Sequence, residues 1–403
     1  MRTPLAGLKV VDMGWLMVGP ESARYLADLG ADVVKVESSV RRDPLRTLGP
    51  FKDGQIGINR SLSHHAINAG KRGIVVDAKH PQGREILTRL LAWADVFVES
   101  FAAGVIDSLG FSYATLVERN PGLIMVSTSL LGRTGPEATG TSGTGTTGAA
   151  FAGATNLLGW PDRAPAGPYG PWTDSVTPRF IVSTVLAALH RRRTTGRGCH
   201  IDAAQAECGL QFLLPAYYAF AANGHVPQRR GDAGSPLCCP AGVYPCAGDD
   251  RWVAIDASDD ASWHALRAVI GGSLLERKFD TLIRRLRARA EIDRLIGDWT
   301  SGRAASDVEA ALQAAGVSAH VVATSQDLAQ DPDLHHQAYF QTITASEIGE
   351  GVIRGPQFSL SRTPPVATRA GPQLGQSTVD ILTTICGLSP QAVEALQESG
   401  ALT

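Results

Sequence analysis

One carboxylate, Asp174, stands where it could act as a nucleophile. It lies in GPYGPWTDSVTPRF, between a run rich in Gly and Pro and a long apolar stretch with helical spacing. A helix that begins here offers Asp174 two roles: an N-cap that accepts a backbone N–H, or a carboxylate that attacks an activated acyl group to form an anhydride. The position by itself favours the N-cap. No GxSxG elbow and no Ser–His–Asp order offers another nucleophile.

A second motif, Gly143-Thr-Gly145-Thr-Thr-Gly148, matches the dinucleotide-binding fingerprint letter by letter. That fingerprint requires a strand directly before the first glycine and a helix at the last. The strand-like LIMVSTS ends well before the motif, and no acidic residue closes a following strand. We therefore interpret residues 139–148 as a flexible loop that covers a substrate. An NAD(P)-dependent oxidoreductase is the alternative.

The N-terminus carries a weaker nucleotide-binding signal. LKVVDM, the turn DMGWLMVGP, a helix and DVVKVE, which ends at Glu37, follow one another. The turn lacks the GxG core, but the N–H groups of residues 18–20 would lie at a helix N-terminus, which favours phosphate or carboxylate. An ordinary first βα unit is the alternative.

Basic residues gather in two nearby stretches and could hold a phosphorylated cofactor through paired charges. They are Arg41, Arg42, Arg46, Lys71, Arg72 and Lys79. A solvated surface is the competing interpretation. The pairs His64-His65 and His335-His336 lie in polar context, and we expect them at the surface.

Strands alternate with helices along the first 130 residues, which predicts βαβ units and an α/β fold with a parallel sheet. Burial on both faces explains the continuous Val/Ile runs. The expected strands are 8–13, 32–37, 72–79, 95–100, 123–129 and 199–203. The expected helices run from Pro20 to Gly30, from Pro81 to Ala94 and from Thr177 to Arg193.

The later part of the chain changes character twice. Residues 133–173 predict a long loop. From about 223 a hairpin, GVYPC and RWVAID, precedes amphipathic helices whose Arg-rich run predicts a solvated face rather than a nucleic-acid site. A helix capped by Ser389 closes the chain.

The composition limits the class of protein. Of 403 residues, 44% are hydrophobic, and 37 Lys and Arg balance 39 Asp and Glu. This excludes a fibre and gives no global reason to bind nucleic acid or an anionic membrane. The six cysteines lack CxxC or zinc spacing, so we expect reduced thiols and no metal site. Without a membrane-spanning stretch or a signal-peptide pattern, we expect a cytoplasmic protein.

Taken together, the segments resemble the class III coenzyme A transferases, the CaiB/BaiF family, nearly from end to end. The likeness lies in the order of LAGLKVVDMG, LADLGADVVKVE, GKRGIVVDAKHPQG, VFVESFAAGVIDSLGF, NPGLIMVSTSLLGRTGP, the Asp174 segment, HRRRTTGRGCHIDAA, PAGVYPCAGDDRWVAID, DLAQDPDL and RAGPQLGQSTVDIL. It implies a Rossmann-like large domain built from 1–222 and 329–403, a smaller α+β domain inserted at 223–328, and an interlocked homodimer.

The resemblance places Asp174 at the family's catalytic aspartate. It implies an acyl-CoA:carboxylate CoA-transferase that works through an aspartyl anhydride and an aspartyl-CoA thioester. The substrates would be an acyl-CoA and a carboxylic acid, with coenzyme A as the carried group and no metal or redox cofactor. The positions that match the family's coenzyme A site are Val18, Lys71, Arg72, Val76, Asp77, Ala78, Lys79, Ser100, Phe101 and Ala102.

The chain departs from the family pattern at several positions. Met17 replaces a common Gln or Ala, Ser108 an Arg, and Pro178 a Gly four residues after Asp174. A 2-methylacyl-CoA racemase of the same superfamily is the alternative activity, but Thr144 stands where that branch has a basic His. The departures suggest an acceptor pocket larger than one for formate or oxalate.

Overall fold

The chain forms two compact units in a computed structural model. The structure describes residues 3–138, 142–231, 237–364 and 369–403. Unit 1 comprises 1–155, 167–226 and 333–403, and unit 2 comprises 156–166 and 227–332. Unit 2 thus takes a short piece of the Gly/Pro-rich region in addition to the stretch where the composition changes.

Unit 1 is built on a six-stranded parallel sheet in the order β3-β2-β1-β4-β5-β6, which confirms the predicted α/β fold. The strands are β1 (Lys9–Asp12), β2 (Asp32–Glu37), β3 (Arg72–Val75), β4 (Val96–Glu99), β5 (Ile124–Ser129) and β6 (Cys199–Ala204). The strand order reverses between β1 and β4. In open parallel sheets, ligands bind at the carboxyl ends of the strands beside such a point.

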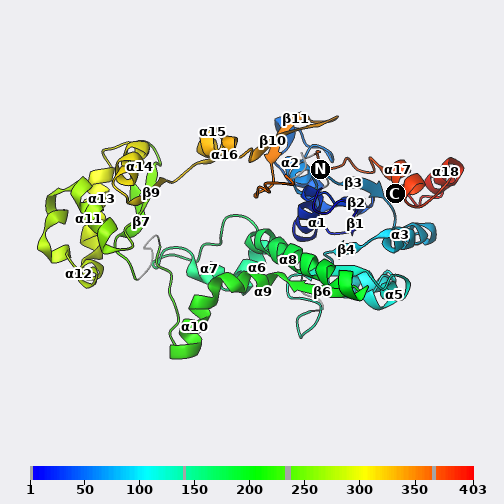
Figure 1. The fold of residues 1–403 in the computed structure, drawn as a ribbon, viewed down its shortest axis with the longest axis horizontal. Helices are drawn as coiled ribbons and strands as arrows, with labels where there is room; N and C mark the ends of the chain where they lie inside the picture. Colours follow the sequence, from blue (N-terminus) through cyan, green and yellow to red (C-terminus); the bar gives the residue numbers. More distant parts are fainter. Residues whose placement is uncertain (1–2, 139–141, 232–236, 365–368) are drawn as a thin grey trace. The chain divides into compact units, whose positions relative to one another are not determined.

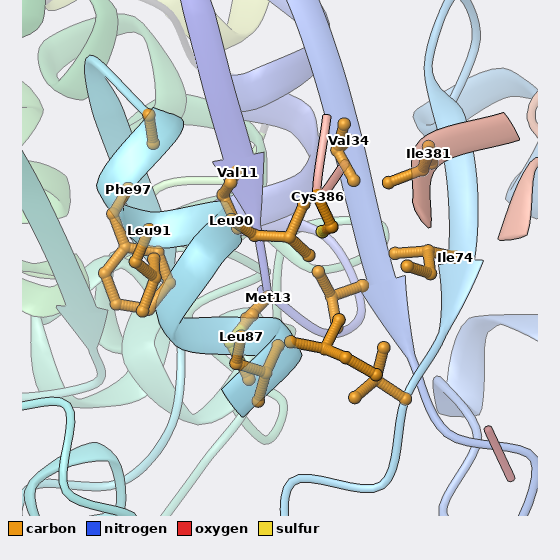
Figure 2. Close-up of a cluster of buried hydrophobic side chains, with 14 of the residues drawn as sticks. Val11, Met13, Val34, Ile74, Leu87, Leu90, Leu91, Phe97, Ile381 and Cys386 are labelled. Atoms are coloured by element: carbon orange, nitrogen blue, oxygen red, sulfur yellow. The ribbon is translucent and has the colours of Figure 1, made fainter. Parts of the chain in front are cut away.

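Helices cover both faces of this sheet. On one face α1 (Val18–Asp28) and α8 (Trp172–Thr195) pack through residues such as Val18 and Ile181. On the other face α3 (Pro81–Trp93) and α5 (Tyr113–Arg119) cover the strands. Figure 2 shows Leu90 of α3 close to Val11 of β1, and Leu87 close to Met13.

The C-terminal segment completes the core of unit 1. Ile381 of α17 (Thr378–Thr384) and Cys386 pack in the same cluster as Ile74 of β3. The last helix, α18 (Pro390–Glu398), lies beside α17 (Figure 1). Its predicted cap is confirmed, because Ser389 Oγ accepts the Ala392 N–H at 3.3 Å.

The remaining elements of unit 1 are short. They are α2 (Leu62–Ile67), α4 (Val105–Ser108), α6 (Gly145–Phe151), α9 (Gln205–Leu210), α10 (Leu214–Asn223), α16 (Pro332–His336), β10 (Phe340–Ala345) and β11 (Gly349–Arg354). A further short helix, α7, spans Ala154–Leu157. The prediction of one long loop over 133–173 is therefore wrong in part. The Gly- and Thr-rich α6 has low intrinsic helix propensity and owes its conformation to tertiary packing.

Unit 2 contains a three-stranded antiparallel sheet of β7 (Ala241–Pro245), β8 (Trp252–Asp256) and β9 (Ser318–Val321). The pairing of β7 with β8 confirms the predicted hairpin. Its helices are α11 (Asp260–Ile270), α12 (Leu282–Arg287), α13 (Arg289–Thr300), α14 (Ala305–Ala314) and α15 (Ser325–Gln330).

The Arg-rich run of unit 2 is not a wholly solvated face. Arg285 is buried, pairs with Asp260 at 2.7 Å and lies over the ring of Trp263. The prediction is wrong there because a guanidinium can stack on an aromatic core side chain while a carboxylate satisfies its charge. In the described part of the chain, no helix is both long and apolar enough to cross a bilayer.

Candidate active site

Asp174 is the third residue of α8. Because α8 leads into the parallel strand β6, its first turn lies at the edge of the sheet where the strands end. The N-cap prediction is wrong, since the helix begins at Trp172 and Pro171 occupies the cap position. Asp174 still lies within the first turn, where the helix dipole favours a negative charge.

The surroundings of Asp174 are almost dry and contain little to balance its charge. The residue is only 6% exposed, and the N–H of Gly145 donates a hydrogen bond to its carboxylate. Among the described residues, Asp174 takes part in no ion pair. Burial raises the pKa of Asp174 to about 6, and the Gly145 N–H opposes that rise. The carboxylate is therefore ionised at neutral pH but poorly solvated.

The glycine motif allows this arrangement. A Cβ on Gly145 would lie 2.6 Å from the carbonyl carbon of Pro171, and one on Gly148 would lie 2.3 Å from Thr173 Oγ1. Thr173 Oγ1 also donates to the carbonyl of Gly145 at 3.2 Å. The glycines thus let α6 approach the first turn of α8 closely enough for Gly145 to reach Asp174.

The interpretation of 139–148 as a flexible loop is accordingly wrong for Gly145–Gly148, which belong to α6. Residues 139–141 lie outside the described residues. Thr144, the position aligned with the racemase histidine, directly precedes α6 and donates its N–H to Thr147 Oγ1 at 2.9 Å.

Pro178 changes the backbone of the same turn. In a helix, the carbonyl of Asp174 would accept the N–H of the residue four positions later. That residue is Pro178, which lies inside α8 and has no N–H. The departure from the family pattern therefore leaves the carbonyl of Asp174 without its helical donor.

The structure brings together Val18, Ser100 and Phe101 at the carboxyl ends of β1 and β4, where the strand order reverses; we call this place the β1–β4 crevice. Val18 is buried at the start of α1, and Ser100 Oγ accepts the N–H of Trp15 at 2.8 Å. The ring of Phe101 meets the ring of Trp15 edge to face, with centroids 5.4 Å apart. Ala102 follows as an exposed residue. Four of the sequence-predicted coenzyme A positions thus surround the point where the strand order reverses.

Residues 76–79 follow β3 at the same edge, but β2 and β1 separate them from that crevice. Val76 is buried and belongs to the core, whereas Asp77 and Ala78 are half-buried. Lys79 is exposed, and its N–H donates to Asp77 Oδ1 at 2.8 Å. Ser108, the departure from a family arginine, is exposed at the end of α4.

Lys71 has no proton left for a ligand. Its fully buried ammonium donates to Asp12 Oδ2 at 2.8 Å, to the carbonyl of Pro20 at 2.7 Å and to Asn68 Oδ1 at 2.8 Å. Burial lowers the pKa of Lys71 to about 8, against the opposing effect of Asp12. The geometry therefore gives Lys71 a structural role.

The other basic residues do not form one phosphate site. Arg72 pairs with Asp32 at 2.6 Å and with Asp380 at 3.1 Å. Arg46 is fully buried and donates to both carboxylate oxygens of Glu37, at 2.8 and 2.6 Å. Exposed members of the cluster are Arg41, Arg42 and Lys79. Carboxylates and backbone carbonyls inside the fold thus engage three of the six cations, and a phosphate contact stays a prediction for the exposed three.

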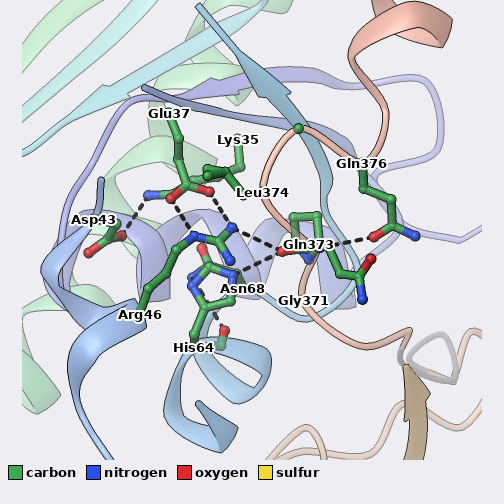
Figure 3. A network of polar contacts seen from close by, with 12 residues as sticks. Lys35, Glu37, Asp43, Arg46, His64, Asn68, Gly371, Gln373, Leu374 and Gln376 are labelled. Atoms are coloured by element: carbon green, nitrogen blue, oxygen red, sulfur yellow. Dashed lines mark hydrogen bonds and ion pairs between the residues drawn. The ribbon is translucent and has the colours of Figure 1, made fainter. Parts of the chain in front are cut away.

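Figure 3 shows Arg46 between Glu37 and the C-terminal segment 371–376, with His64 close by. His64 Nε2 lies 3.1 Å from the carbonyl of Pro372, and His65 Nδ1 lies 2.9 Å from that of Gly371. Both histidines are buried, so their predicted surface location is wrong. Their rings hydrogen-bond to carbonyls of a segment 300 residues away along the chain. His335 and His336 are exposed, as predicted.

These contacts also weigh against the oxidoreductase alternative. In a dinucleotide-binding enzyme, Glu37 would bind a ribose hydroxyl. Here both of its carboxylate oxygens accept hydrogen bonds from Arg46. Within the first βα turn, Asp12 accepts the N–H of Gly14 at 2.8 Å, and Ser100 and Asp43 accept those of Trp15 and Leu16. These three N–H groups are therefore not free to bind a pyrophosphate.

The sequence profile of CoA-transferase family III, matched across residues 5–378, decides the assignment. The chain belongs to CoA-transferase family III. Its relatives include the succinyl-CoA–D-citramalate CoA-transferase of Chloroflexus aurantiacus, 30% identical over 98% of this chain and 97% of that protein. The succinate–glutarate CoA-transferase of Agrobacterium fabrum is 30% identical over 94% and 95% of the two chains.

A solved structure gives the same assignment for the fold. A CaiB/BaiF family protein from Brucella suis superimposes with a TM-score of 0.85 at 31% identity, covering 96% of this chain and 100% of that one. The recognition of the family from sequence is thus confirmed.

Sequence reasoning missed two features of this family III enzyme. One is the N–H of Gly145 as the partner of Asp174, although three glycines shortly before the Asp174 segment were a usable signal. The other is the set of buried carboxylates, Asp12, Asp43 and Glu99, that each accept a backbone N–H beside the β1–β4 crevice. No sequence spacing links Asp43 to the turn it contacts.

Proposed function

We propose that this family III enzyme transfers coenzyme A from an acyl-CoA to a carboxylic acid, with Asp174 as the nucleophile. The observation that carries the proposal is a buried, ionisable carboxylate that has a single backbone donor and no ion pair among the described residues. A carboxylate that is poorly solvated and not neutralised by a cation retains its nucleophilicity.

The reaction proceeds through four acyl exchanges at Asp174. Its carboxylate attacks the thioester carbonyl, the C–S bond breaks, and CoA thiolate leaves a mixed anhydride. The thiolate attacks the Asp174 carbonyl, which releases the donor acid and forms an aspartyl-CoA thioester. The acceptor carboxylate attacks this thioester to give a second anhydride and free thiolate. The thiolate then attacks the acceptor acyl carbon, which forms the new acyl-CoA and regenerates Asp174.

Each step exchanges one activated carboxyl group for another, so the chemistry requires no net proton transfer, metal or redox cofactor. The near-complete burial of Asp174 supports this proposal for a second reason. An anhydride shielded from solvent hydrolyses slowly, so coenzyme A rather than water captures it.

We assign coenzyme A binding to the carboxyl edge of the sheet in unit 1. Val18, Ser100, Phe101 and Ala102 would line the crevice between β1 and β4, and residues 76–79 would extend the site along the same edge. The aromatic ring of Phe101 is half-buried and can pack against the nucleotide or pantetheine. Lys71 and Arg72 would support this edge from beneath without contacting the ligand.

The acids exchanged are proposed to be dicarboxylic. The names of the two relatives above pair succinyl-CoA with D-citramalate, and succinate with glutarate. These are larger than formate or oxalate, in line with the acceptor pocket expected from the sequence departures. Succinyl-CoA is therefore the first donor to test against a panel of carboxylic acids.

We also propose that the enzyme is a homodimer. Helix α10 is apolar yet has no buried residue, and Tyr217, Tyr218 and Phe220 are each more than half exposed. Large aromatic side chains exposed together on one helix are typical of a protein interface. Light scattering should give twice the chain mass; a monomer at micromolar concentration would contradict this proposal.

The nucleophile is tested by Asp174→Asn. We expect transfer to fall by about 10³-fold or more, because the first bond cannot form. Asp28→Asn, studied as folded protein, is a control for burial, since Asp28 is also buried but pairs with Arg24 and lies at the far end of α1. It should retain activity. Incubation of the wild-type enzyme with succinyl-CoA and hydroxylamine should give a hydroxamate on Asp174 by mass spectrometry.

Transfer by the folded Asp174→Asn enzyme within a few-fold of wild type would overturn the proposal. So would exchange of the α-hydrogen of a 2-methylacyl-CoA in heavy water without any transfer, which is the expected signature of the racemase.

A further inference from the structure

The turn between β1 and α1 contains a residue in an unusual backbone conformation. Leu16 has φ = 59°, in the left-handed region that residues with a Cβ rarely adopt. The neighbouring side chains of Trp15 and Met17 are half-buried, like that of Leu16 itself. A leucine persists in this conformation only where the surrounding structure holds it.

Asp43 stabilises this conformation through hydrogen bonds on one side of the turn. Its Oδ1 accepts the N–H of Leu16 at 2.9 Å and also that of Leu45 at 3.0 Å, while its Oδ2 pairs with Lys35 Nζ at 3.1 Å. Lys35 in turn donates to the carbonyl of Gly14. Both charged residues are fully buried, and Figure 3 shows them facing one another at the end of β2. The carbonyl of Gly14 and the N–H of Leu16 are thus both hydrogen-bonded to the Lys35–Asp43 ion pair.

Ser100 holds the same turn from the other side. Its hydroxyl accepts the N–H of Trp15 at 2.8 Å and lies 3.3 Å from the Trp15 carbonyl, to which it can donate. Since Trp15 also packs edge to face on Phe101, the turn connects the two loops that flank the β1–β4 crevice. Its backbone hydrogen bonds point inward, and the partly exposed side chains of residues 15–17 remain to meet a ligand.

We propose that Asp43 is a positioning residue for acyl-CoA, which fixes Leu16 in its left-handed conformation so that residues 15–17 form a preshaped wall of the coenzyme A site. Asp43 does not contact the ligand. It acts through the backbone of Leu16, and the ion pair with Lys35 orients its carboxylate. A wall that is already ordered in the free enzyme loses little entropy when the ligand binds. This inference rests on the proposed function, because it takes coenzyme A to bind at that crevice.

The test is the affinity for coenzyme A, measured by calorimetry on the full chain and therefore independent of turnover. For Asp43→Asn we expect the Kd of coenzyme A and the KM of acyl-CoA to rise about tenfold, with kcat within about threefold of wild type. Ser61→Ala is the matched control. Ser61 is fully buried nearby, and its hydroxyl lies 2.6 Å from the carbonyl of Leu48 and 3.1 Å from that of Leu45 and has no contact with the turn. Its Kd should stay within twofold even where its Tm falls.

A second substitution separates positioning from general destabilisation. Asn adopts the left-handed region far more readily than Leu. In a Leu16→Asn background, Asp43→Asn should therefore raise the Kd by less than threefold. A merely structural role would give the same loss in both backgrounds. Equal losses, or an unchanged Kd in Asp43→Asn, would overturn the inference.

Hydrogen exchange of the wild-type enzyme tests the inference without any variant. A peptide covering residues 13–17 should be protected in the free enzyme nearly as well as in its complex with coenzyme A. Fast exchange in the free enzyme that slows only on binding would contradict the preshaped wall. If wild-type enzyme binds no coenzyme A at all, the proposed function fails instead.

Discussion

Buried carboxylates at the carboxyl edge of the sheet in unit 1 are of two kinds: some are paired with a buried cation, and one is not. Asp12, Glu37 and Asp43 each face a buried cation, namely Lys71, Arg46 and Lys35. Asp174 has one backbone N–H and no cation within ion-pair distance among the described residues. A paired carboxylate is held in place and poorly reactive, whereas an unpaired one retains its charge for chemistry at the expense of stability. The comparison separates structural from reactive acids more clearly than burial alone, because all four residues are buried.

The largest loss of stability is expected when a buried ion pair is broken. Lys71→Met removes the countercharge of Asp12 and leaves two further buried acceptors, Pro20 O and Asn68 Oδ1, without their donor. Breaking a buried pair from one side typically costs about 3–5 kcal/mol, so we expect a loss of that size in calorimetric unfolding. Lys278→Met removes two exposed ion pairs, with Glu276 and Glu291, and should leave the Tm nearly unchanged. An equally small change for both variants would show that the buried pair does not stabilise the fold more than the exposed one.

A smaller effect of opposite sign is expected at Asp174. Burial raises its pKa from 3.8 to about 6, so the folded state binds the proton more tightly than the unfolded state. Ionisation therefore destabilises the fold above pH 6, and this penalty fades as the pH falls through 6 and is absent below about 4. Asp174→Asn should be more stable than wild type by up to about 3 kcal/mol at pH 8, and nearly equal to it at pH 4.

Asp12→Asn provides the contrast, because it leaves Lys71 buried without its countercharge and should destabilise the protein at pH 8. Thermal unfolding of the wild type and of both variants at pH 4 and pH 8 tests this prediction. A wild-type enzyme more stable than Asp174→Asn at pH 8 would show that Asp174 is a structural acid like the others.

The smallest effect on stability is expected from Gly145→Ala. The added methyl would meet the backbone of Pro171, which cannot move aside as a flexible side chain can. We expect a loss of about 1–3 kcal/mol together with a fall in kcat of tenfold or more, since α6 would withdraw its N–H from Asp174. Gly167→Ala, where no atom lies within 4 Å of the added Cβ, should change neither. Unaltered turnover in Gly145→Ala would mean that this N–H does not orient the nucleophile.

Much of unit 1 was predictable because its signals are local. The alternation of apolar runs with helical stretches led to all six strands of the parallel sheet, with β2 at the predicted boundaries. The predicted strand at 72–79 is longer than β3, which ends at Val75, because residues 77–80 form a turn instead. It also missed α6, whose Gly and Thr residues become helical only against α8.

The candidate site also contains one residue that was predictable from local sequence and several that were not. Asp174 is prominent in the sequence, since it lies between a Gly/Pro-rich stretch and a strong helix, and family resemblance singles it out. Its partner Gly145 and the interior roles of Lys71, Arg46 and His64 could not be predicted from spacing. Lysine and arginine are usually exposed and histidine is intermediate, and their burial here depends on contacts across long sequence separations.

The amino-acid sequence by itself determined the α/β class, the family and the identity of the candidate nucleophile, because periodicity, composition and motif order are properties of the chain. Only the tertiary structure decided which acids are neutralised and which is not. Ion pairs such as Lys71–Asp12, 59 residues apart, and the hydrogen bond from Gly145 to Asp174 exist only once the sheet edge has formed. The reactivity of a carboxylate depends on its dielectric surroundings and the charges near it, which only three-dimensional proximity provides.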